Sequence, residues 1–183
     1  MTRVLALLFA IMCAASASAQ PAQPLPAGLD SQNTLVLDTT QGRIFIKLRN
    51  DIAPNHAQRL KQLARDHFYD DVPFHRVIDG FMAQTGDGQN RNGTGGSKYP
   101  ALKAEFSSVP YTRGVVGMAR TSDPNSANSQ FFIMFAPNAH LTGQYTVVGE
   151  VVRGMDVVDK LKRGEPPTNP DKNVHAQVAA DMK

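Results

Sequence analysis

Short segments along the chain alternate between apolar and polar residues, which is the pattern of β-strands with one buried face. The segment 43–48 reads Arg-Ile-Phe-Ile-Lys-Leu and follows an apolar run at 34–37. The five residues between these runs are typical of a turn, so the two runs are predicted to pair as a hairpin. Further strands are expected at 114–119, 130–135, 147–152 and 174–180.

Two other segments carry apolar residues at helical spacing. The first, 54–64, has Pro54 in a first-turn position and places His56 on the face expected to be exposed. The second runs from 154 to about 162, with Gly164 as a suitable stop. The apolar positions of the two segments are Ala57, Leu60, Leu63, Ala64, Met155, Val157, Val158 and Leu161.

The segment 74–87, Phe-His-Arg-Val-Ile-Asp-Gly-Phe-Met-Ala-Gln-Thr-Gly-Asp, combines a strand pattern with candidate chemistry. Alternation puts Arg76 on one face, which Met82 and Gln84 share after a break at Gly80. This face would be apolar, with a guanidinium at one end and an amide at the other. Both groups hydrogen-bond without exchanging protons, so the face suits a peptide better than a nucleotide or a sugar. A buried strand whose arginine caps a carbonyl elsewhere is the alternative.

The first 19 residues have the pattern of a secretory signal peptide. Arg3 supplies the positive charge, 4–12 the apolar region, and Ala17-Ser18-Ala19 a cleavage site of small residues. We therefore expect cleavage after Ala19 and export, with a bacterial periplasm as the expected compartment. No later stretch approaches the roughly 20 apolar residues of a membrane span, so a soluble mature chain is expected.

Residues 20–32 are rich in proline and predict a short, extended leader or tether ahead of a single domain at 33–183. Cys13 is the only cysteine, so cleavage would leave neither a thiol nor a disulfide. Lipidation of Cys13 is an alternative, although Met12 before it is bulkier than such sites usually tolerate.

Composition narrows the function further. A chain of 183 residues with 42% hydrophobic residues fits one globular domain. Its net charge is only +3 and no run of Lys and Arg occurs, so neither nucleic acid nor an anionic membrane is a favoured partner.

Several kinds of active site lack their motifs in this sequence. There is no His-Glu-x-x-His pattern, cysteine cluster or acidic loop with metal-ligand spacing, so neither a metal nor a cofactor is expected. The glycines at 93–96 are not followed by the Lys-Ser/Thr of a phosphate-binding loop. No Gly-x-Ser-x-Gly elbow occurs, and no serine is placed by motif to act with His75 or His140. His75 is interpreted as a packed, hydrogen-bonded residue of its strand.

The segment 74–87 is accompanied by a second set of motifs: 118–121, 128–133, Leu141 with Gly143, and 147–151. Together they resemble the cyclophilin family of peptidyl-prolyl cis/trans isomerases, over about 34–180. The resemblance implies a mainly β fold, a closed eight-stranded antiparallel barrel capped by two α-helices. Its interior would be packed, and the binding groove would lie on the outer surface.

The resemblance also implies residue roles. Arg76 would donate to the prolyl nitrogen, with Phe81 and Gln84 beside it as the catalytic group. The residues implied to contact the substrate are Met82, Gly93, Ala119, Gln130, Phe132, His140, Leu141 and Tyr145. The expected activity is isomerisation of Xaa-Pro bonds in unfolded or folding exported proteins by a monomer without a cofactor. A chaperone that binds peptides in the same groove with negligible turnover is the alternative.

The sequence departs from the family pattern at four positions. Asp79 stands where proline is frequent, and Thr85 where glycine is frequent. Tyr145 replaces a frequent histidine but keeps a hydrogen-bond donor. His140 stands where many members have the tryptophan that binds cyclosporin, so weak cyclosporin binding is expected.

Overall fold

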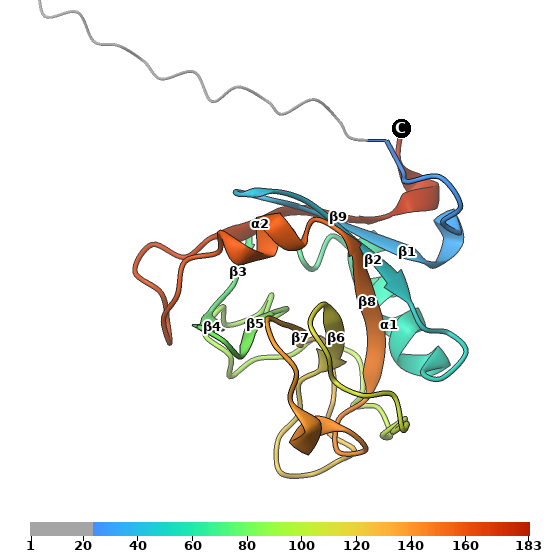
Figure 1. Ribbon diagram of the computed structural model, residues 1–183, viewed down its shortest axis with the longest axis vertical. Helices are drawn as coiled ribbons and strands as arrows, with labels where there is room; N and C mark the ends of the chain where they lie inside the picture. The colour runs from blue at the N-terminus through green and yellow to red at the C-terminus, as the bar shows by residue number, and fades with distance from the viewer. Residues whose placement is uncertain (1–23) are drawn as a thin grey trace, which may run out of the picture.

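The computed structural model describes residues 24–183, and Figure 1 shows their arrangement. The expected signal peptide and the start of the expected leader lie outside the described residues. Within the rest of that leader, Leu25 packs against buried Val36 and Phe45, and Ser31–Asn33 form a short 3-10 helix, η1. None of the helices in this part of the chain combines the length and apolar character required to cross a bilayer.

The predicted hairpin is confirmed. Strands β1 (Thr34–Thr39) and β2 (Gly42–Leu48) pair antiparallel, with Val36 opposite Phe45. The later strands are β3 (Val72–Pro73), β4 (Arg76–Ile78), β5 (Met82–Thr85), β6 (Val115–Met118), β7 (Phe131–Met134), β8 (Val147–Arg153) and β9 (Lys172–Val178). All pairings are antiparallel, in the order β3-β9-β1-β2-β8-β6-β7-β5-β4.

The mainly β class is confirmed, but the expected closed eight-stranded barrel is wrong. The described residues form a curled nine-stranded sheet with β3 and β4 as its two edges. Pro73 on β3 has no amide to donate, and the amide of Phe74 donates to the carbonyl of Asp171 at 2.9 Å. On β4, Val77 exchanges both backbone hydrogen bonds with Gly164 at 2.8 Å. Residues 74–75 link the two edge strands, and the bridge between Val77 and Gly164 occupies the free edge of β4.

Alternation along the strands separates an interior core from a smaller outer cluster. Phe131 and Ile133 belong to the interior core, whereas Phe132 and Met134 belong to the outer cluster. Successive residues of β7 therefore face opposite sides of the sheet. The outer cluster lies on the face that carries the candidate site.

Two helices pack on the interior core and lie at separate sides of the curled sheet (Figure 1). Helix α1 (Pro54–Arg65) agrees with the predicted helix. Helix α2 (Met155–Asp159) is shorter than predicted and ends well before Gly164. Its continuation is interrupted because the amide of Lys162 donates to the Asp171 carboxylate at 2.9 Å.

The prediction that His56 is exposed is wrong. Its side chain is fully buried, and its Nδ1 lies 2.6 Å from Oε2 of Glu105. Glu105 also accepts the backbone amides of Asn55 and His56, so this carboxylate from a distant loop caps the helix N-terminus and covers its first turn. Burial lowers the pKa of His56, although the Glu105 carboxylate opposes that shift.

Candidate active site

Two adjoining pockets form a groove on the outer face of β4, β5 and β7, beside the segment that follows β6. The first, here the apolar pocket, has a volume of about 130 Å³. It is lined by Arg76, Phe81, Met82, Gln84, Ala119, Arg120, Phe132, Leu141 and Tyr145. The second, here the polar pocket, has a volume of about 160 Å³ and shares Gln84, Ala119 and Arg120 with the first.

Strand register brings three site residues into one row. Arg76 on β4 is the cross-strand partner of Gln84 on β5, and Gln84 is the partner of Phe132 on β7. Directly opposed residues on neighbouring strands point to the same face of a sheet. A guanidinium, an amide and an aromatic ring therefore lie side by side along the groove.

The floor of the apolar pocket is closely packed. Phe132 is buried, stacks on Tyr111 at 5.9 Å between ring centroids, and meets the edge of Tyr145 at 5.9 Å. The guanidinium of Arg120 lies 4.4 Å from the Tyr145 ring centroid, which adds a cation–π contact at the rim. Such a pocket can hold a small apolar ring and keep water away from it.

Arg76 is anchored through one nitrogen only. Its Nε donates to Oε1 of Glu165, and its side chain remains 41% exposed. Among the described residues, no other hydrogen-bond partner of the guanidinium is found. Its two terminal amino groups can therefore donate to a bound peptide.

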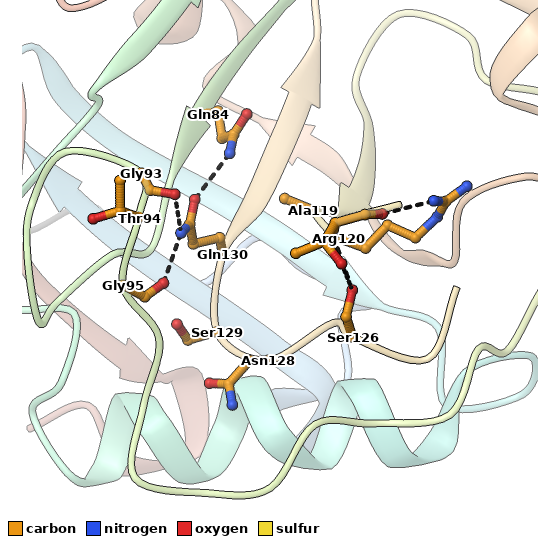
Figure 2. A pocket seen from close by; sticks show the side chains of 11 residues that line it. Gln84, Gly93, Thr94, Gly95, Ala119, Arg120, Ser126, Asn128, Ser129 and Gln130 are labelled. Atoms are coloured by element: carbon orange, nitrogen blue, oxygen red, sulfur yellow. Dashed lines mark hydrogen bonds between the residues drawn. The ribbon is translucent and has the colours of Figure 1, made fainter. Parts of the chain in front are cut away.

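A chain of amide hydrogen bonds connects the two pockets (Figure 2). Gln84 Nε2 donates to Gln130 Oε1 at 2.9 Å, and Gln130 Nε2 donates to the carbonyls of Gly93 and Gly95 at 2.9 and 2.8 Å. Gln84 keeps a second N–H on Nε2 and its carbonyl oxygen for a ligand. Gln130, for which we expected substrate contact, thus also ties the glycine-rich loop to β7.

Asp87 also holds the glycine-rich loop in place. Its carboxylate accepts the backbone amides of four residues: Asn90, Asn92, Gly93 and Gly95. Burial alone would raise the pKa of Asp87, but these four donors outweigh burial and hold the pKa below its usual value.

The backbone conformation and the close neighbours of residue 93 favour glycine there. Its φ is +93°, and a Cβ there would lie 3.0 Å from the His75 ring. His75 is packed as predicted, but its expected hydrogen bond is not found: both ring nitrogens are buried without a partner among the described residues. Burial lowers the pKa of His75, with the Asp87 charge opposing the shift.

His140 is the expected contact residue that lies outside both pocket linings. It is exposed on the short 3-10 helix η2 (Ala139–Leu141), one residue before Leu141, which does line the apolar pocket. Two of the other departures also lie away from the pockets. Asp79 pairs with Arg163 at 3.0 Å, and buried Thr85 donates to the carbonyl of Pro73 at 2.9 Å.

The residues that sequence reasoning did not assign to the site include Arg120 and Glu165, the ion-pair partner of Arg76. Arg120 lines both pockets. It directly follows Ala119 in the motif 118–121, and that position could have indicated its place in the groove. Glu165 had no signal, because it comes from an irregular loop and reaches Arg76 only through the folded chain.

Comparisons with known proteins agree with this geometry. The family model for "Cyclophilin type peptidyl-prolyl cis-trans isomerase/CLD" matches residues 34–179. A probable peptidyl-prolyl cis-trans isomerase of Brucella suis biovar 1 (strain 1330) is 52% identical over 169 residues, covering 84% of this chain and 86% of that protein. Peptidyl-prolyl cis-trans isomerase B of Escherichia coli (strain K12) is 40% identical over 132 residues, covering 68% and 80%.

Solved structures show the same fold. Cyclophilin AquaCyp293 from Hirschia baltica superimposes with a TM-score of 0.77 at 31% identity, covering 85% of this chain and 77% of that one. A Cryptosporidium parvum cyclophilin, solved in the presence of the dipeptide Ala-Pro, gives a TM-score of 0.73 at 23% identity, covering 79% and 98%. The matched family model, the relatives and the shared fold together establish that this chain belongs to the cyclophilin-type peptidyl-prolyl cis-trans isomerases.

Proposed function

We propose that this peptidyl-prolyl cis/trans isomerase acts on unfolded or folding polypeptides outside the cytoplasm, and that Arg76 is its transition-state donor. The observation that carries the proposal is the row formed by Arg76, Gln84 and Phe132 along one groove. This row presents a charged donor, an amide and an apolar surface to the same ligand.

The reaction needs no nucleophile and no cofactor. Resonance between the carbonyl and the nitrogen lone pair gives peptide-bond rotation a barrier of about 18–20 kcal/mol. Uncatalysed exchange before proline takes tens to hundreds of seconds. As the bond twists, the lone pair returns to the prolyl nitrogen. A donor aimed at that nitrogen is therefore bound more strongly in the twisted state than in either planar state, which is the condition for catalysis.

In this proposal the proline ring occupies the apolar pocket. Phe81, Met82, Phe132 and Leu141 contact the ring, while a terminal amino group of Arg76 donates to the prolyl nitrogen. Loss of one preorganised donor typically costs about 2.7–4 kcal/mol of transition-state stabilisation. The rest of the acceleration comes from holding the twisted geometry and from excluding water.

Residues flanking the proline occupy the polar pocket. Gln84 donates its remaining N–H to a substrate carbonyl, and Ala119 borders the substrate backbone. Gln130 acts mainly by holding the carbonyls of Gly93 and Gly95 in place. The Tyr145 hydroxyl contributes a hydrogen-bond donor at the rim of the apolar pocket. His140 lines neither pocket and contacts only ligands that extend past Leu141.

The proposed site of action follows from the N-terminal pattern at 1–19, which supports export to a bacterial periplasm. Proteins that fold there after translocation contain Xaa-Pro bonds that must reach one isomer. We propose that the protein acts there as a monomer.

A protease-coupled assay with proline-containing peptides tests the enzymatic part of the proposal. The purified protein is expected to accelerate the cis-to-trans phase in proportion to its concentration. If peptides bound the groove in a fluorescence titration while that phase kept its uncatalysed rate, the protein would be a peptide-binding chaperone instead.

A further inference from the structure

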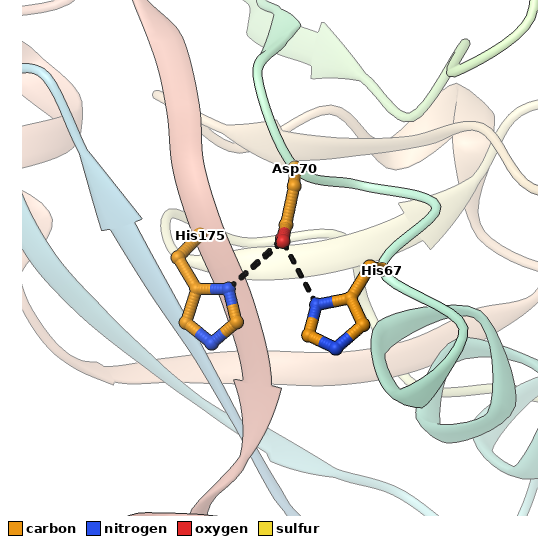
Figure 3. Close-up of side chains that lie close together, drawn as sticks. All are labelled: His67, Asp70 and His175. Carbon is orange, nitrogen blue, oxygen red and sulfur yellow. Dashed lines mark hydrogen bonds and ion pairs between the residues drawn. The ribbon is translucent and has the colours of Figure 1, made fainter.

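We infer that His67, Asp70 and His175 form a binding site for one divalent transition-metal ion of the kind that takes imidazole ligands, such as Zn²⁺. The three residues come from two separate parts of the sequence. His67 and Asp70 lie in the segment after α1, whereas His175 lies on β9. Figure 3 shows both imidazole rings turned toward the single carboxylate between them.

The distances are close to those of a metal centre. Nδ1 of His67 lies 2.9 Å from Oδ2 of Asp70, and Nδ1 of His175 lies 3.0 Å from both carboxylate oxygens. The three candidate ligand atoms lie within 4.8 Å of one another. Zinc bonds of about 2.0–2.1 Å in tetrahedral geometry separate neighbouring ligand atoms by roughly 3.3 Å. Both nitrogen–oxygen separations are therefore within a few tenths of an ångström of the ligand spacing in such a site.

The ligands are held in place before an ion arrives. Oδ1 of Asp70 accepts the backbone amide of Ala176 at 3.0 Å, which fixes the carboxylate against β9. The two imidazole rings stack, with centroids 5.6 Å apart and planes 27° apart. His67 follows α1 with a φ of 56°, which is in the left-handed region where glycine is usual after a helix. This backbone conformation fixes the direction in which its side chain points.

Ion binding requires each ring to present the lone pair of its Nδ1 to the metal. In the metal-free protein each Nδ1–H donates to Asp70. When the ion takes the Nδ1 lone pairs, each proton moves to Nε2 of the same ring. The His67 side chain is 69% exposed, so its Nε2–H can be hydrated. Solvent access also lets water complete the coordination, as in zinc sites with three protein ligands.

The cluster is separate from the groove. Both histidines line a surface hollow of about 530 Å³ that shares no lining residue with the apolar or the polar pocket. Arg65 and Lys183 also line this hollow, and Asp181 offsets Arg65 through an ion pair at 2.9 Å. A bound ion would therefore stabilise the fold, because it would join the segment after α1 to β9, more than 100 residues later in the sequence.

Titration of the untagged, chelator-treated protein with Zn²⁺ in a calorimeter tests the inference. We expect one ion per chain, and a rise in Tm of roughly 5–10 °C at a hundredfold excess of Zn²⁺ over its Kd. Asp70→Asn should weaken binding at least about tenfold while keeping an acceptor for the Ala176 amide. His140→Ala is the matched control, since it removes an exposed histidine outside the cluster and should leave binding unchanged.

His67→Gly gives the sharpest test. Glycine suits a φ of 56°, so the variant should fold at least as well as the parent without metal, yet lose the Zn²⁺-dependent rise in Tm. Absence of binding by the parent would overturn the inference. So would Zn²⁺ affinity that is the same in the parent, His67→Gly and Asp70→Asn proteins.

Discussion

Arg76 and Glu165 form an ion pair at the edge of the apolar pocket, although 89 residues separate them in the sequence. The pair uses Nε of Arg76 and leaves both terminal amino groups of the guanidinium available. Glu165 therefore orients the proposed donor without competing for the atoms that would meet the substrate.

Glu165→Ala should lower kcat/KM by no more than about fivefold. The two side chains are 41% and 53% exposed, and exposed ion pairs contribute about 0.2–1 kcal/mol. Glu165→Gln should lie between this variant and the parent, because the amide oxygen still accepts from Nε. A loss of 50-fold or more in the protease-coupled assay would mean that the carboxylate has a larger role than orientation.

Two buried histidines should make the protein less stable in mild acid. Burial lowers the pKa of both His56 and His75 in the folded state. The unfolded chain then binds more protons, so the free energy of unfolding decreases as the pH falls from about 6.5 towards the folded pKa values. Urea unfolding at pH 7.5 and 5.5 measures this difference.

A His56→Gln variant provides the matched comparison for that measurement, because one of the two titrating groups is gone. Its stability should fall less between pH 7.5 and 5.5 than that of the parent. An equal or steeper fall would show that His56 is not the source of the loss.

Inhibition by cyclosporin should be weak. His140 stands beside Leu141 at the end of the apolar pocket and offers a smaller ring than the tryptophan of sensitive cyclophilins. His140→Trp should tighten cyclosporin at least about tenfold, equivalent to about 1.4 kcal/mol, with little change in turnover. Strong inhibition of the parent, or no gain in the variant, would show that residue 140 is not the rim position.

Export should remove residues 1–19 and leave Gln20 at the N-terminus. The intact mass of the protein recovered from the periplasm measures this directly. A mature chain that keeps Cys13 and carries added lipid mass would replace the expected soluble form with an anchored one.

Local pattern was sufficient to predict that Arg76 and Gln84 share a face, whereas Phe132 was assigned to the same groove only through the family resemblance. Each residue lies on a short strand, and the period of two fixes which side chains share a face. The hairpin of β1 and β2 and helix α1 were predictable for the same reason, since their signals lie within a dozen residues.

Features that depend on distant contacts were not predictable. His56 is buried because Glu105, 49 residues away, covers it, and nothing near His56 indicates this. Helix α2 stops early because Asp171 takes a backbone amide beyond its end. The sheet stays open at β4 because Val77 bonds to Gly164 in a loop.

The kcat/KM of Arg76→Ala tests the central claim most directly. We predict a loss of about 100-fold or more, equivalent to about 2.7 kcal/mol, in a protein that remains folded by circular dichroism. Arg65→Ala is the matched control, because Arg65 also pairs with a carboxylate through Nε and is similarly exposed, but lies outside the groove. It should turn over at the parent rate. A folded Arg76→Ala protein that isomerises proline peptides at nearly the parent rate would contradict the role proposed for Arg76.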